Sequence, residues 1–104
     1  MKNIYAGIPE ELPEELIEPL LETGKLTIER IVSRGHTSPE DGWYDQDRNE
    51  WLVLLSGNAT ILFADGTETR LSPGDTLHIP AHRKHRVTRT APDTETLWLA
   101  VHYP

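Results

Sequence analysis

Short runs of β-forming residues, separated by turn-forming residues at intervals of about ten positions, limit the possible folds of this chain most strongly. From Lys25 onward we predict strands over residues 25–33, 49–56, 59–64, 67–71, 76–79, 85–90 and 95–102. Gly57-Asn58 and Asp65-Gly66 lie between such runs and accept positive φ angles, so both pairs predict tight hairpins. This spacing is typical of an antiparallel β-barrel or β-sandwich.

The first 24 residues have a different pattern. Leucines at positions 12, 16 and 20 recur at helical spacing, and acidic residues precede them as they do at helix N-termini. Prolines at positions 9, 13 and 19 rule out one uninterrupted helix, so we predict short helical turns that end at Thr23-Gly24. The expected organisation is a helical segment over residues 1–24 packed on a single β-barrel domain over residues 25–104.

The composition excludes several classes of function. The chain has no cysteine, so disulfides and thiolate chemistry are excluded, and any metal ion would bind to nitrogen and oxygen. A net charge of −7 argues against nucleic acid or an anionic membrane surface as a partner. No apolar run is long enough for a membrane helix or a signal peptide, so we expect a cytoplasmic protein.

One segment is locally basic and could attract an anion or simply form a solvated loop. It contains His82, Arg83, Lys84, His85, Arg86 and Arg89.

The run Trp51-Leu52-Val53-Leu54-Leu55 is apolar on both faces of its predicted strand. A strand in a one-sided sheet would alternate apolar with polar residues, so its outer face must be covered. The N-terminal segment or a second subunit could cover it. Because symmetric dimers are the commonest oligomers, we predict a homodimer.

Gly74, Pro80 and His85 have the spacing of the second sequence motif of the cupin superfamily, and the passage resembles that family at these positions. His82 stands where the family has glycine, and Arg89 stands where it has asparagine. The resemblance implies that His85 is a metal ligand. His82 is expected to border the opening of the barrel.

The run from Glu50 to Gly57 matches the second half of the first cupin motif, but the preceding His-x-His pair is missing. Depending on the spacing used, its two positions hold Tyr44 and Gln46, or Trp43 and Asp45. If the chain is extended here, period two places Tyr44 and Gln46 on the same face as Glu50 and turns Asp45 away.

The resemblance covers roughly residues 25–102 and implies an all-β fold, the double-stranded β-helix or jelly-roll barrel of cupins. It further implies a divalent ion, which could be zinc, manganese, iron or nickel, at the barrel opening. We predict Glu50 and His85 as ligands, with Gln46 and His36 as further candidates, and Tyr44 and His82 as pocket residues.

Two other histidines are expected to lie outside the site. His78 should face the surface or a subunit interface, and His102, next to the C-terminus, should have no catalytic part.

Three hypotheses about function remain open. The first is a metal-dependent enzyme that acts on a small molecule, with Glu50 or His82 transferring protons. The second is a non-catalytic module that binds a small molecule or an anion, using a rim of Arg83, Lys84 and Arg86. The third is a structural dimer in which Glu50 merely pairs with His85. The reaction and the substrate are not specified by these residues.

Overall fold

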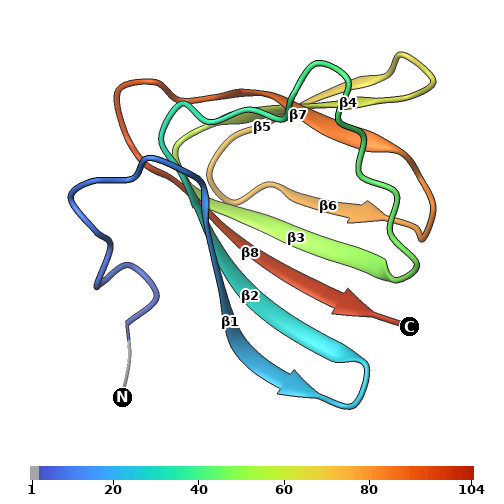
Figure 1. Ribbon diagram of the computed structural model, residues 1–104, viewed down its shortest axis with the longest axis horizontal. Coiled ribbons are helices and arrows are strands. Elements are labelled where there is room, and N and C mark those ends of the chain that lie inside the picture. Colours follow the sequence, from blue (N-terminus) through green and yellow to red (C-terminus); the bar gives the residue numbers. More distant parts are fainter. Residues whose placement is uncertain (1–2) are drawn as a thin grey trace.

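The computed structural model describes residues 3–104, which form two antiparallel β-sheets. The strands are β1 (Leu16–Thr23), β2 (Leu26–Ser33), β3 (Asn49–Ser56), β4 (Ala59–Phe63), β5 (Glu68–Leu71), β6 (Thr76–Ile79), β7 (His85–Thr90) and β8 (Thr96–Tyr103). The larger sheet has the order β1-β2-β8-β3-β6, and the smaller sheet has the order β5-β4-β7. The two sheets face each other as the layers of a jelly roll (Figure 1).

All the strands predicted from residue 25 onward are present, with bounds that differ by at most one residue. The two predicted hairpins are also present, and Gly57 and Gly66 adopt φ angles of 83° and 93°. Turn chemistry and period-two alternation are local properties, so the sequence was sufficient to predict them.

The predicted N-terminal helical segment is wrong, because the chain forms the edge strand β1 there and the described residues before it contain no helix. β1 pairs with β2 through a tight turn at Gly24, whose φ is 55°. A bulge between Pro19 and Leu21 interrupts the pairing. An edge strand tolerates proline, whereas three prolines would remove hydrogen bonds from a helix, and pairing with β2 supplies bonds that the helix could not.

The stretch before β1 is fastened to the outer face of the larger sheet by Arg30, which is only 6% exposed. Its Nη1 donates to the carbonyl oxygens of Ile4 and Ala6 at 3.1 and 2.6 Å, and its guanidinium forms an ion pair with Glu18. The N-terminal segment therefore covers part of that face. Trp51, further along the same face, remains 38% exposed.

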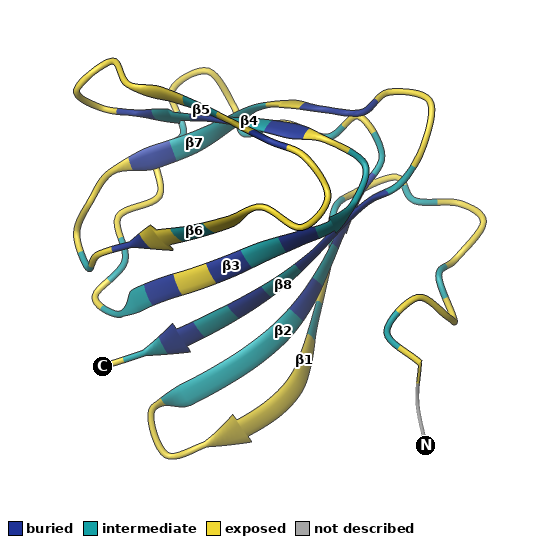
Figure 2. Cartoon of the chain, turned by 180° about the vertical axis from the view of Figure 1, so that it is seen from behind, coloured by how far each residue is buried: buried dark blue, intermediate teal, exposed yellow. Residues whose placement is uncertain are grey.

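The hydrophobic core lies between the two sheets. Leu52 and Leu54 of β3 point inward and are 3% and 0% exposed. Figure 2 shows β8 as largely buried and β1 as largely exposed. The remaining members of the core are Ala59, Ile61, Phe63, Leu71, Ile79, Trp98 and Ala100. Within residues 3–104, no helix has the length and apolar composition needed to cross a membrane.

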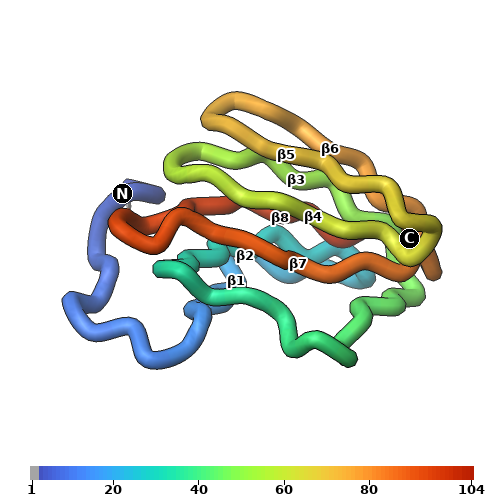
Figure 3. Tube along the Cα trace, turned by 90° about the horizontal axis from the view of Figure 1, so that it is seen from above, coloured from blue at the N-terminus to red at the C-terminus, as the bar shows by residue number. Residues whose placement is uncertain are grey.

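The segment between β2 and β3 runs beside β7 and extends the smaller sheet irregularly (Figure 3). The Ser38 amide donates to the carbonyl of Val87 at 2.8 Å. Tyr44 and His85 exchange two backbone hydrogen bonds of 2.8 and 3.2 Å. This pairing brings a loop that the sequence left unassigned to the start of β7, where the candidate site lies.

Candidate functional site

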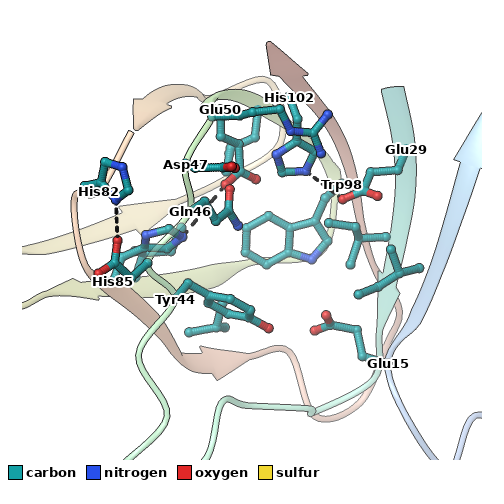
Figure 4. Close-up of a pocket in the computed structure, with 17 residues that line it drawn as sticks. Glu15, Glu29, Tyr44, Gln46, Asp47, Glu50, His82, His85, Trp98 and His102 are labelled. Atoms are coloured by element: carbon teal, nitrogen blue, oxygen red, sulfur yellow. Dashed lines mark hydrogen bonds and ion pairs between the residues drawn. The ribbon is translucent and has the colours of Figure 1, made fainter. Parts of the chain in front are cut away.

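A cavity of about 500 Å³ opens between the two sheets, and residues from both sheets line it (Figure 4). Core residues Leu52, Ile61 and Val87 form its apolar part. The loop over residues 44–48 and several carboxyl and imidazole side chains form its polar part. A cavity with an apolar floor and a few convergent polar groups is the usual form of a small-molecule site.

Glu50 and His85 face each other in this cavity, although they come from different sheets. Glu50 Oε1 lies 3.8 Å from His85 Nε2, and the two residues are 6% and 5% exposed. No hydrogen bond to the Glu50 carboxyl group occurs within residues 3–104. Burial raises the pKa of Glu50, while His102 and His85 act in the opposite direction. The structure thus brings together the two residues on which the sequence-based site depended.

The His85 ring is oriented by its own backbone. Its Nδ1 lies 2.9 Å from the carbonyl oxygen of Arg83. Because a carbonyl oxygen only accepts, Nδ1 donates, and the lone pair of the neutral ring is on Nε2, which faces Glu50. The Tyr44 ring, centred 5.4 Å away, also contacts this imidazole. His85 is therefore fixed in a tautomer that can accept a proton inside the cavity.

A second buried pair, His102 with Glu29, was missed by the sequence analysis. His102 is 6% exposed, lines the cavity, and has its Nε2 2.7 Å from Glu29 Oε1. This hydrogen bond raises the pKa of His102, although burial opposes it. The sequence did contain a signal for it, because side chains alternate between the two faces of a strand and His102 follows Trp98 and Ala100 on the inward face of β8. In the sheet, His102 is the register partner of Glu50.

The loop over residues 44–48 differs from the extended chain that the parity rule assumed. Asp45 was predicted to point away, but it lines the cavity, and its Oδ1 lies 2.9 Å from His82 Nδ1. Period two fails because residues 45–48 are not in a strand. Gln46 also lines the cavity, and its carbonyl oxygen accepts the His82 amide at 2.7 Å.

His82 lines the cavity edge with an unusual backbone, since its φ is 64°. This is the left-handed region that glycine adopts without strain, and the cupin motif has glycine at this position. The departure from the motif therefore keeps the glycine-like backbone and adds an imidazole to the rim.

The structure does not bring His36 to the cavity. Its Nδ1 accepts the Arg34 amide at 2.9 Å in the loop that follows β2. In the described chain, no three His, Asp or Glu side chains form a group that could hold a metal ion. Glu50, His85 and the amide of Gln46 supply one carboxylate, one imidazole and one weak donor. This set does not fit the four-ligand centre that the family motif implies.

The basic side chains of the segment after β6 do not form a rim around the cavity. Arg83 stacks over the Phe63 ring at 3.7 Å from its centroid, and Arg86 lies over the Trp43 ring and donates to the Glu40 carbonyl. None of Arg83, Lys84 and Arg86 is among the lining residues. The proposed anion site at this rim has no geometric support.

The fold and the cavity define a small double-stranded β-helix protein with a ligand pocket. The cupin domain family model matches residues 31–102, and this chain belongs to the cupin family. No curated protein matches the chain.

Solved structures support the family assignment. A protein from Ralstonia eutropha JMP134, provisionally assigned as a mannose-6-phosphate isomerase, is 44% identical, with a TM-score of 0.94 over 99% of this chain and 96% of that one. An RmlC-like cupin with a double-stranded β-helix fold from Methanocaldococcus jannaschii is 18% identical (TM-score 0.72, 94% and 87% coverage). The DMSP lyase DddQ from Ruegeria pomeroyi DSS-3 is 20% identical (TM-score 0.71), and the match covers 86% of this chain but 47% of the lyase. The last two similarities concern the fold alone.

Proposed function

We propose that this cupin binds a small polar molecule in its cavity and that Glu50 and His85 transfer protons to and from it. The observation that carries the proposal is the buried pair itself, 3.8 Å apart, with a carboxyl group to which no described residue donates a hydrogen bond. Burying a carboxyl group in this way weakens a fold unless the group interacts with something else. A perturbed pKa inside a pocket is typical of functional sites.

The two groups are suited to opposite roles. The raised pKa of Glu50 keeps its proton at a higher pH than usual, so it can act as an acid. His85 Nε2, unprotonated in the neutral ring, can act as a base. The gap between them is wider than a hydrogen bond, so an atom of the bound molecule can contact both groups.

The His102–Glu29 pair supports the same chemistry. The raised pKa of His102 favours the imidazolium form, which places a positive charge beside Glu50. Such a charge stabilises negative charge that develops on a bound molecule during proton abstraction. Glu29 fixes the orientation of the ring through its 2.7 Å hydrogen bond.

The reaction class that fits best is proton exchange next to a carbonyl group, as in aldose–ketose isomerisation. One group removes a proton from carbon, and the other delivers a proton to the neighbouring carbon or oxygen. The provisional isomerase assignment of the Ralstonia relative, 44% identical, is consistent with this class.

The experiment is hydrogen–deuterium exchange into a panel of aldoses and ketoses in D₂O, followed by NMR. We expect exchange with the wild-type protein, a loss of about 100-fold or more in Glu50→Gln and His85→Gln, and no change in the exposed control Glu22→Gln. Exchange that is unaffected by both site substitutions would overturn the proposal.

A metal-dependent reaction and a non-catalytic binding module are the competing outcomes. Stoichiometric metal in the purified protein, lost in Glu50→Gln together with chelator-sensitive exchange, would favour the metal-dependent enzyme over proton transfer by the side chains alone. Ligand binding without any exchange would favour the non-catalytic module.

A further inference from the structure

The interior wall of the cavity contains a hydrogen-bond donor without a partner. Trp98 is 4% exposed and lines the cavity, and its Nε1 is buried with no hydrogen-bond acceptor within residues 3–104. Buried indole N–H groups are normally paired, because an unpaired donor costs free energy. In Figure 4 the nitrogen edge of this indole faces the part of the cavity away from His82. Side chains packed over this nitrogen leave it almost no accessible surface, so a bound molecule whose acceptor atom displaces them would satisfy the donor.

Two other polar groups point to the same part of the cavity. Figure 4 shows the Tyr44 hydroxyl and the Glu15 carboxyl group directed toward the side where the Trp98 nitrogen lies. The Ser33 hydroxyl donates to Glu15 Oε2 at 3.2 Å, and Oε1 makes no hydrogen bond in the described chain. The region therefore offers one fixed donor, one free acceptor and one hydroxyl that can do both.

The charges around the cavity disfavour an anionic ligand. Its lining contains the carboxyl groups of Glu29, Asp45 and Asp47, besides those of Glu15 and Glu50, whose pKa values are raised by burial. Arg48 also lines the cavity, and its Nη1 donates to the Lys25 carbonyl and the Thr27 hydroxyl at 3.0 and 2.9 Å. His102 is paired with Glu29. A phosphate group would meet more carboxyl groups than cations, because Arg48 is the one Lys or Arg side chain among the lining residues of the described chain.

We propose that the cavity binds an uncharged polyhydroxylated molecule, one of whose hydroxyl groups accepts a hydrogen bond from Trp98 Nε1 and donates one to Glu15. A hydroxyl is the simplest group that both accepts and donates. The Tyr44 hydroxyl is positioned to contact a neighbouring hydroxyl of the same molecule. The inference rests on the proposed function only in placing the ligand in this cavity.

The test uses the indole N–H signals in a ¹H–¹⁵N NMR spectrum, because the chain has three tryptophans. Trp43 and Trp51 are 40% and 38% exposed, so Trp43→Phe and Trp51→Phe should fold normally and identify the Trp98 signal by elimination. D-mannose, D-glucitol and ribitol are then titrated, each against its phosphate monoester. We expect at least one of the uncharged polyols to move the Trp98 signal downfield and its phosphate ester to bind more weakly.

Variants test the assigned contacts. We expect Trp98→Phe to weaken polyol binding by about three- to tenfold, the loss of one hydrogen bond, and Trp51→Phe to leave it unchanged. Glu15→Gln keeps an acceptor and should bind better than Glu15→Leu. Phosphate esters that bind as tightly as the polyols, or no movement of the Trp98 signal with any polyol, would overturn the inference.

The subsite and the proton-transfer proposal fail in different ways. A polyol that moves the Trp98 signal equally in wild type and in Glu50→Gln supports the subsite, whatever the exchange assay shows. Deuterium exchange that depends on Glu50, from a ligand that leaves the Trp98 signal unmoved, refutes the subsite alone.

Discussion

Adding one methyl group to Gly57, the last residue of the first cupin motif, should damage the fold severely. Its φ is 83°, and a Cβ built there would lie 2.4 Å from Thr96 Oγ1, 2.7 Å from Thr96 Cα and 2.8 Å from the Glu95 carbonyl oxygen. Two of these atoms belong to the backbone at the start of β8, so rotating a side chain does not remove the overlap. In Gly57→Ala, β8 must move away from the end of β3.

The expected cost has two parts. Overpacking of this kind costs about 1–3 kcal/mol, and a left-handed backbone costs a residue other than glycine about 1–2 kcal/mol. A central value of about 3 kcal/mol is a large share of the roughly 5–15 kcal/mol that stabilises a typical domain. For a domain of this size it should lower the Tm by about 12–24 °C.

Thermal and urea unfolding followed by circular dichroism measure this loss, and Gly66→Ala is the matched control. Gly66 has a φ of 93°, but a Cβ there meets nothing within 4 Å. The control should therefore lose only the backbone part, about 1–2 kcal/mol. Equal losses in the two variants would refute the role assigned to the Thr96 contact.

Three further predictions concern the site and the outer face of the larger sheet. Burial raises the pKa of Glu50, so its stabilising contribution is complete below its unfolded pKa and is lost as the pH rises through the folded value. Glu50→Gln should therefore gain stability relative to wild type as the pH rises above the ordinary range of a glutamate, and a pH-independent difference in urea unfolding would contradict this. His82→Gly should stabilise the fold by about 1 kcal/mol or less, because relieving its left-handed backbone gains more than is lost with the exposed ion pair to Asp45. A clear loss of stability in thermal unfolding would show that the φ of 64° causes no strain. We propose that two copies associate through the exposed face around Trp51. Trp51→Glu should then convert a dimer to a monomer in analytical ultracentrifugation. A wild-type protein that is already monomeric would exclude the dimer.

The N-terminal segment shows where local pattern is insufficient. Leucines four residues apart fit a helix, but Leu16 and Leu20 also fit a bulged edge strand. What decides between the two is the neighbour, because β2 offers a free row of backbone hydrogen-bonding groups. A window of sequence contains no information about that neighbour, so propensity pointed to the wrong element.

The site, too, contains residues that local spacing identified and residues that it missed. The spacing of Glu50 to Gly57 and of Gly74 to His85 identified the central pair, because a motif preserves the local geometry that places each side chain on its strand. Asp45 was misjudged because the parity rule was applied outside a strand. His102 was set aside because it lies next to the C-terminus, a position that does not reveal that it is the register partner of Glu50.

The sequence by itself determined which segments become strands from residue 25 onward, where the tight turns fall, and which glutamate and histidine face the cavity. These are consequences of side-chain alternation, glycine conformations and short-range spacing. Only the tertiary structure decided that β1 joins the sheet, that His102 pairs with Glu29, and that the Trp98 N–H at the cavity wall has no acceptor within residues 3–104. Each of these depends on which strands lie side by side and in what register, and that is set by burying one common core rather than by any single segment.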